Sequence, residues 1–94
     1  MENFKIEMFD DFFEAVLKLK SKEDCRKFFE DVCTIKELQD VSQRLEVAKL
    51  LNEKKNYQEI SKLTGASTAT ISRVNKCLLY GKEGYQVVLE KVED

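Results

Sequence analysis

Residues 57–76 have the sequence YQEISKLTGASTATISRVNK, and this stretch decides the fold that the sequence predicts. Its polar and apolar residues favour a short helix over residues 57–63 and a second helix over residues 68–80. The residues between them, Thr-Gly-Ala-Ser at 64–67, are typical of a tight turn. Gly81 follows the second helix and is predicted to end it as a left-handed C-cap.

Two helices that cross at a steep angle need particular residue types at particular positions. Ile60 is apolar, as it must be to hold the first helix against the second, and Ser61 is small where the helices cross. Gly65 supplies the backbone freedom that the turn requires. Ile71 and Val74, one turn apart, form the buried side of the second helix. Together these positions predict a helix-turn-helix.

The predicted helix-turn-helix spans about residues 57–79 and has a polar side opposite its buried residues. In this motif the N-terminal residues of the second helix enter the major groove of DNA, while the first helix crosses the backbone. Hydroxyl groups there can reach phosphates and base edges, and Ala69 can touch a thymine methyl. The candidate DNA-binding residues are therefore Gln58, Lys62, Ser67, Thr68, Ala69, Thr70, Ser72, Arg73 and Lys76.

The charge of the chain is distributed unevenly. The net charge is −2, but residues 54–82 contain six basic residues and one acidic residue, which is a net charge of +5. The remainder contains ten basic and seventeen acidic residues, a net charge of −7. An acidic body with one basic segment is expected of a protein that docks locally on double-stranded DNA.

Composition excludes several classes of protein. The 94 residues suit a single domain, with 43% hydrophobic and 36% charged residues. There is no histidine, no zinc-ligand spacing and no catalytic signature, so we expect neither an enzyme nor a bound metal or cofactor. No apolar run could cross a membrane and no signal peptide opens the chain, so a cytoplasmic protein is expected. The three separated cysteines are interpreted as reduced, partly buried thiols: Cys25, Cys33 and Cys77.

The rest of the chain is also predicted to be helical, because it lacks proline and has no glycine before Gly65. Ser21 with Asp24, and Thr34 with Glu37, have the spacing of capping boxes at two helix starts. The predicted helices cover about residues 7–20, 21–33, 35–53, 57–63, 68–80 and 85–92.

The apolar stripes of the first three helices are broad. The third helix has two adjoining seams, one from Leu38 to Ala48 and one from Val47 to Leu51. All six phenylalanines fall within the first 29 residues, which predicts an aromatic core in the front half. Such helices are either buried within the chain or covered on their second side by another chain. The stripe of the first helix is Phe9, Phe12, Phe13, Val16 and Leu17, and that of the second is Cys25, Phe28, Phe29 and Val32.

Residues 65–73, GASTATISR, and residues 57–60, YQEI, closely resemble the Trp repressor superfamily, and within it the YerC/YecD type of small bacterial protein. The resemblance implies one domain over residues 1–94, with an all-α, six-helix Trp-repressor-like fold and a C-terminal helix at 84–92. It further implies an intertwined homodimer, whose helices within residues 1–53 interlock between two chains. A two-fold dimer would place two DNA-contacting helices about one turn of DNA apart.

The resemblance also implies an effector pocket. Arg73 matches the arginine that holds tryptophan in the repressor, Arg44 matches the arginine over the indole, and Thr34 falls near a threonine from the other chain. Two departures argue against tryptophan as corepressor. Val74 stands where the repressor has glycine and fills space that the ligand uses, and Cys77 replaces a serine near the ligand's amino group. A surface ion pair for Arg44 and a phosphate contact for Arg73 are the favoured alternatives.

The sequence therefore predicts a homodimeric, sequence-specific DNA-binding regulator that represses transcription. The alternative from another class is a protein-interaction adaptor that retains the fold without binding DNA, since helix pairs with a glycine turn also bind proteins. A third possibility is a regulator that senses a different small effector beside Arg73.

Overall fold

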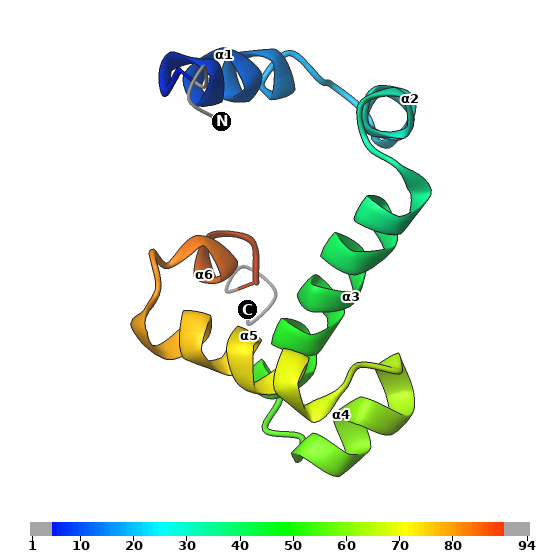
Figure 1. The fold of residues 1–94 in the computed structure, drawn as a ribbon, viewed down its shortest axis with the longest axis vertical. Coiled ribbons are helices and arrows are strands. Elements are labelled where there is room, and N and C mark those ends of the chain that lie inside the picture. Colours follow the sequence, from blue (N-terminus) through cyan, green and yellow to red (C-terminus); the bar gives the residue numbers. More distant parts are fainter. Residues whose placement is uncertain (1–4, 90–94) are drawn as a thin grey trace. The chain divides into compact units, whose positions relative to one another are not determined.

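The computed structural model describes residues 5–89, and every regular element within that range is a helix. The helices are α1 (Glu7–Val16), α2 (Lys22–Val32), α3 (Ile35–Asn52), α4 (Tyr57–Thr64), α5 (Thr68–Tyr80) and α6 (Gly84–Leu89) (Figure 1). The predicted all-helical fold with six helices is confirmed. The chain divides into two compact units, Met1–Leu38 and Gln39–Asp94.

α1 ends at Val16, earlier than the predicted Lys20. Beyond Val16 the N–H groups of Lys18 and Leu19 donate to carbonyls three residues back rather than four, so the helix tightens and stops. Ser21 has an extended backbone, with φ −150° and ψ 165°, because it caps the next helix. The prediction was wrong because apolar periodicity continues past the point where the chain has to turn.

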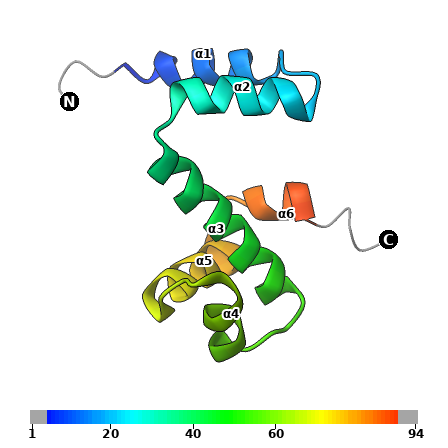
Figure 2. The same ribbon diagram turned by 90° about the vertical axis from the view of Figure 1, so that its right-hand side faces the viewer.

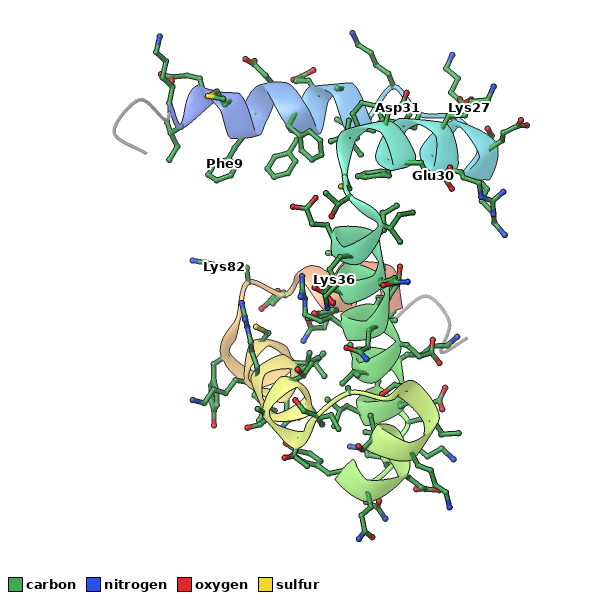
Figure 3. The ribbon with its side chains drawn as sticks, turned by 45° about the vertical axis from the view of Figure 1, so that its right-hand side comes forward. Phe9, Lys27, Glu30, Asp31, Lys36 and Lys82 are labelled. Atoms are coloured by element: carbon green, nitrogen blue, oxygen red, sulfur yellow. The ribbon has the colours of Figure 1, made fainter. Side chains whose placement is uncertain are left out.

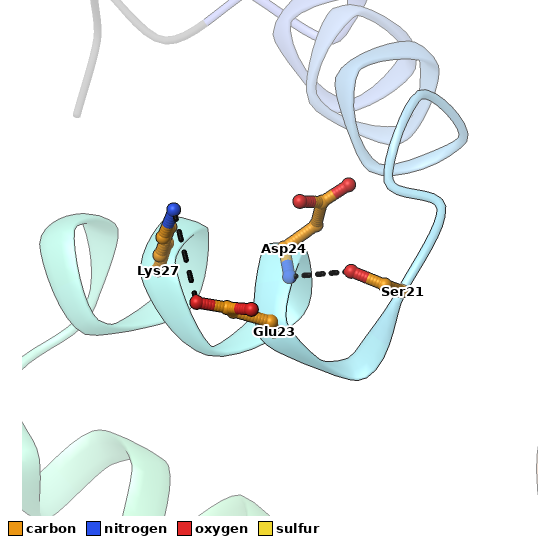
Figure 4. A network of polar contacts seen from close by, with 4 residues as sticks. All are labelled: Ser21, Glu23, Asp24 and Lys27. Atoms are coloured by element: carbon orange, nitrogen blue, oxygen red, sulfur yellow. Dashed lines mark hydrogen bonds and ion pairs between the residues drawn. The ribbon is translucent and has the colours of Figure 1, made fainter.

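α2 begins with the predicted cap. The N–H of Asp24 donates to Ser21 Oγ at 3.0 Å (Figure 4). The Asp24 carboxylate accepts from the N–H of Lys20 at 3.1 Å. One turn into the helix, Lys27 Nζ lies 4.0 Å from Glu23 Oε2. Both of these side chains are about three-quarters exposed, so their ion pair adds little to stability. The cap that the Ser21 side chain forms, and not this ion pair, sets the start of α2.

The phenylalanine rings of α1 and α2 pack together without being enclosed. The centroid of the Phe12 ring lies 5.9 Å from those of Phe13 and Phe28 and 6.3 Å from that of Phe29. Phe9 projects from α1 and stacks on Phe13 (Figure 3). No described residue of α1 or α2 is fully buried, so the predicted aromatic core in the front half is wrong for the single chain.

The predicted inner face of α2 is only partly covered. Phe28 and Phe29 are half-buried, whereas Cys25 and Val32 are exposed. Leu17, which follows the last residue of α1, is 80% exposed. Apolar side chains of these two helices therefore remain in contact with solvent in the isolated chain.

α3 begins with a complete capping box. The N–H of Glu37 donates to Thr34 Oγ1 at 3.0 Å, and the N–H of Thr34 donates to Glu37 Oε1 at 2.8 Å. Two backbone donors at the start of the helix are thereby satisfied. The predicted start of the third helix is confirmed.

α3 ends at Asn52, one residue before the predicted end, in a Schellman motif. The N–H of Lys55 donates to the carbonyl of Leu50, and the N–H of Lys54 donates to that of Leu51, both within 3.1 Å. Lys54 has the left-handed conformation that this motif requires, with φ 69°. A lysine thus occupies a position at which glycine is usual.

Only one of the two predicted seams of α3 is buried. Val47 and Leu50 are buried, whereas Val41 is 50% exposed and Leu45 is 44% exposed. Ala48, at the end of the exposed seam, is also buried. One face of α3 therefore belongs to the core and the adjoining face does not.

The core of the second unit is where α4, α5 and α6 pack against the C-terminal part of α3 (Figures 1 and 2). Its partly buried margin includes Leu51, Tyr57, Leu78 and Tyr85. Its buried residues are Val47, Ala48, Leu50, Ile60, Ala66, Ile71, Val74 and Leu89.

α5 ends differently from the prediction. Gly81 has φ −85° and an extended backbone, so it is not the left-handed C-cap expected. Its N–H donates to the carbonyl of Cys77 at 2.9 Å, and a Cβ at Gly81 would collide with that carbonyl oxygen. Glycine is required at position 81 because the backbone there lies too close to the Cys77 carbonyl oxygen to leave room for a side chain. The left-handed residue is Glu83, with φ 67°.

α6 begins at Gly84, where the predicted C-terminal helix of residues 84–92 begins, and is described to Leu89; its predicted continuation to 92 lies outside the described residues. Gln86 Nε2 donates to the carbonyl of Leu78 at 2.9 Å and ties α6 to the end of α5. Among residues 5–89, no helix has the length and apolar character needed to cross a membrane.

Candidate nucleic-acid interface

α4, the turn and α5 form the predicted helix-turn-helix. Ile60 and Ile71 are fully inaccessible to solvent, and Val74 is nearly so. The predicted helix-turn-helix requires buried apolar residues at these three positions. Gly65 has φ 78° and forms the left-handed C-cap of α4, which few other residues adopt without strain. Ser61 is half-buried beside them. The residue types that predicted the motif are confirmed in these roles.

Hydrogen bonds within the turn satisfy its polar groups. Ser61 Oγ donates to the carbonyl of Ala66 at 2.8 Å, so this serine does more than provide space where the helices cross. Thr64 Oγ1 accepts from the N–H of Ala66 at 3.1 Å and donates to the carbonyl of Ile60 at 2.7 Å. The N–H of Gly65 donates to the carbonyl of Ser61 at 2.8 Å. The turn is therefore a closed, well-defined structure.

One residue outside the motif also bonds to the turn. Gln43, half-buried on α3, donates from Nε2 to the carbonyl oxygen of Thr64 at 3.1 Å. Gln43 is not among the functional residues predicted from the sequence. Its only sequence signal is an amide side chain among the apolar residues of α3, which is too common to single it out.

Side chains on the outer face of α5 are available to a ligand. Ser67 Oγ accepts from the N–H of Thr70 at 3.1 Å and caps the helix, and its hydroxyl donates to Thr70 Oγ1 at 3.2 Å. Thr70 is half-buried. The N-terminal end of α5 also carries unpaired backbone N–H groups and partial positive charge, which favour an anion. The exposed candidates on or beside α5 are Ser67, Thr68, Ala69, Ser72, Arg73 and Lys76.

The two candidate residues of α4 are also exposed. Gln58 and Lys62 line a shallow surface depression together with Asn56 and Glu59. Asn56 Oδ1 accepts from the N–H of Glu59 at 2.9 Å and caps the start of α4. Glu59 is the one acidic residue of the basic segment, and within α4 its charge offsets that of Lys62.

The basic residues of segment 54–82 are all exposed. Among the described residues none of them forms an ion pair, so their charges are not neutralised by neighbouring carboxylates. Figure 3 shows Lys82 extending outward beyond the end of α5. The uncompensated charge predicted from the sequence is thus present on the surface of the second unit.

The residues of the predicted effector pocket lie in both compact units. Thr34 belongs to the first unit, and both its N–H and its hydroxyl bond to Glu37. Arg44 is half-buried on α3, while Arg73 and Cys77 are exposed, one turn apart on α5. The pocket remains a prediction. Cys25 and Cys77 are exposed, so the interpretation of all three thiols as partly buried holds for Cys33 alone.

Within residues 5–89 no group of three or more Cys, Asp or Glu side chains is placed to hold a metal ion. The features that the described residues bring together are a rigid turn, an exposed polar helix face and unpaired positive charge.

Comparison with known proteins gives consistent matches. The family described as Trp repressor protein matches residues 7–93. The uncharacterised protein YerC of Bacillus subtilis (strain 168) is 51% identical over 85 residues, which cover 90% of this chain and 82% of that protein.

Two crystal structures are similar over nearly the whole chain. One is of a TrpR-like protein from Eubacterium eligens ATCC 27750, with a TM-score of 0.90 and 48% identity, covering 99% of this chain and 96% of the other. The second is of a candidate Trp repressor from Staphylococcus aureus, with a TM-score of 0.89 and 41% identity, covering 98% and 92%.

Proposed function

Because the chain belongs to the Trp repressor family, a family of DNA-binding regulators, we propose that it is a sequence-specific transcription regulator. Its ligand is double-stranded DNA, bound through α4 and α5. The observation that carries this proposal is the exposed, polar and basic face of α5, whose opposite face is anchored by Ile71 and Val74.

The docking follows from the two faces of the motif. In helix-turn-helix proteins, of which the Trp repressor is a standard example, the second helix enters the major groove. Thr68, Ala69 and Ser72 would then approach base edges, and Arg73 and Lys76 would approach phosphates on either side. Gln58 and Lys62 on α4 would contact the backbone. Because its proposed ligand is chromosomal DNA, we expect the protein to act in the bacterial cytoplasm.

We propose that the functional form is an intertwined homodimer. Its support is the apolar surface that the single chain leaves exposed on α1, α2 and the Val41–Leu45 face of α3. Burying such a side chain contributes roughly 1.5–3 kcal/mol, so a second copy would stabilise these helices substantially. A two-fold dimer would bind a two-fold symmetric site and would repress by occluding a promoter.

Tryptophan is not part of the proposal. Val74, at the position where the resemblance predicts glycine, is packed into the core with Ile60 and Ile71. A different small effector beside Arg73 is the remaining alternative, and stabilisation of the protein by one member of a metabolite panel would support it.

The first test is selection of bound sequences from a random DNA pool at near-physiological salt. A two-fold symmetric site with half-sites about ten base pairs apart is expected. Affinity for that site should fall with salt by about 0.9 logarithmic units per phosphate contacted, for each tenfold rise in concentration. Failure to enrich any site, with or without cell metabolites, would favour the adaptor alternative.

The second test locates the interface. Lys62→Glu and Arg73→Glu should each abolish binding to the selected site while leaving the dimer intact, because they place negative charge against phosphate. Lys27→Glu, on the exposed surface of α2, is the matched control and should bind as the wild type does. Unchanged binding by both interface variants would show that α4 and α5 do not face DNA.

A further inference from the structure

One long-range hydrogen bond connects α3 to the turn of the helix-turn-helix. Gln43 Nε2 donates to the carbonyl oxygen of Thr64 across 21 residues of sequence, at 3.1 Å. Both residues are half-buried and lie in the second compact unit. A hydrogen bond shielded in this way is worth more than one on the open surface.

The acceptor in this bond needs a donor from outside its own helix. Thr64 is the last residue of α4, so its carbonyl has no later N–H of that helix to accept from. The neighbouring polar groups of the turn are satisfied locally, through Ser61, Thr64 Oγ1 and the backbone of Ala66. Gln43 therefore completes a turn that is otherwise closed on itself.

The bond is directional where the surrounding packing is not. Ile60, Ile71 and Val47 hold α4 and α5 against α3 by apolar contact, which tolerates small sliding movements. A donor fixed on α3 and a carbonyl in the turn leave less freedom, because hydrogen bonds weaken steeply away from linear geometry. α5 begins at Thr68, directly after the turn, so a movement of the turn moves the start of α5.

We infer that Gln43 is a positioning residue for DNA binding. Through the carbonyl of Thr64 it fixes the turn, and thereby the N-terminal residues of α5 that contact bases. This inference rests on the proposed function and adds to it a residue outside the motif that controls discrimination between DNA sequences.

The test uses Gln43→Ala, Gln43→Glu and the control Gln39→Ala, an exposed glutamine one turn earlier on α3. Affinity is measured for the selected DNA site and for scrambled DNA of the same length. Gln43→Ala should weaken binding to the selected site by up to about tenfold and leave scrambled DNA unchanged, because fixing the opened turn again in the complex costs at most about the free energy of one hydrogen bond. Gln43→Glu should weaken it at least as much, because a carboxylate cannot donate to a carbonyl. Gln39→Ala should behave as the wild type.

A second measurement follows the turn directly. Amide hydrogen exchange at Gly65 and Ala66 should become faster in Gln43→Ala and remain unchanged in Gln39→Ala, because the turn opens locally. Equal losses of affinity for both DNAs, with a lower unfolding midpoint, would show a merely structural role and overturn the inference. Unchanged affinity for the selected site would also overturn it while leaving the proposed function standing. A wild type that binds neither DNA would instead refute the proposed function itself, and the inference with it.

Discussion

Lys54 adopts a left-handed backbone conformation at the end of α3, where its N–H and that of Lys55 satisfy the last carbonyls of the helix. A residue with a Cβ in this conformation is strained by roughly 1–2 kcal/mol. Replacing it by glycine relieves the strain but increases the entropy of the unfolded chain. The two effects oppose each other, and strain is the larger.

We therefore expect Lys54→Gly to raise the free energy of unfolding by about 0.5–1 kcal/mol. Urea denaturation of both proteins measures this difference in the free energy of unfolding. Lys55→Gly is the control, because Lys55 has no left-handed conformation to relieve, and it should be neutral or destabilising. A lower stability for Lys54→Gly than for Lys55→Gly would contradict the Schellman geometry.

Ile60 belongs to the core that α4 shares with α5, and it is fully inaccessible to solvent. Ile60→Ala should lower the free energy of unfolding by about 2–5 kcal/mol, because it removes buried methyl groups and leaves a cavity. Leu63→Ala, on the same helix but 65% exposed, should change it by less than about 0.5 kcal/mol. Equal losses for the two variants, measured by denaturation, would place the core elsewhere.

At the scale of a helix, Ser67 has two roles that substitution can separate. It caps α5, and it lies at the end of that helix proposed to meet DNA. Ser67→Ala removes the cap and should cost about 1 kcal/mol of stability. Ser67→Asp retains a capping oxygen and adds negative charge that suits the helix N-terminus, so stability should be kept.

DNA affinity should follow the opposite order. Ser67→Asp places negative charge against phosphate and should bind the selected site more weakly than Ser67→Ala, although it is the more stable protein. Paired measurements of unfolding midpoint and DNA affinity check this. If the aspartate variant binds DNA as tightly as the wild type, the N-terminus of α5 does not approach the backbone.

At the scale of the whole molecule, the distribution of apolar surface predicts behaviour that depends on concentration. If two copies interlock, the unfolding midpoint should rise with protein concentration by mass action. Leu45→Glu should lower the midpoint and weaken that dependence, because it places a charge on the exposed face of α3. Gln39→Glu adds the same charge at an exposed polar position and serves as the control.

A midpoint that does not vary with concentration, or a folded monomer in ultracentrifugation, would contradict the intertwined dimer. In that case the exposed side chains of α1 and α2 would need a different partner, as the adaptor alternative supposes.

The sequence by itself determined the helices and the motif, because the signals for these act over a few residues. Ser21 and Thr34 each cap a helix at the predicted position, since a cap needs only the N–H groups two or three residues later. Asn56 and Ser67 cap α4 and α5 in the same way. Gly65 was predictable for the same reason. Helix ends were less so: α1 stopped early, and Gly81 served close approach to Cys77 rather than a left-handed cap.

Only the tertiary structure decided which apolar faces are buried and what holds the turn. Both seams of α3 have the same periodicity, yet Val47 and Leu50 are buried in the core with residues of α4, α5 and α6, while Val41 and Leu45 are about half exposed. The bond from Gln43 to the turn joins residues 21 positions apart, so no local pattern could indicate it. Periodicity and capping are properties of one helix, whereas burial and long-range bonds depend on which helices come together in space.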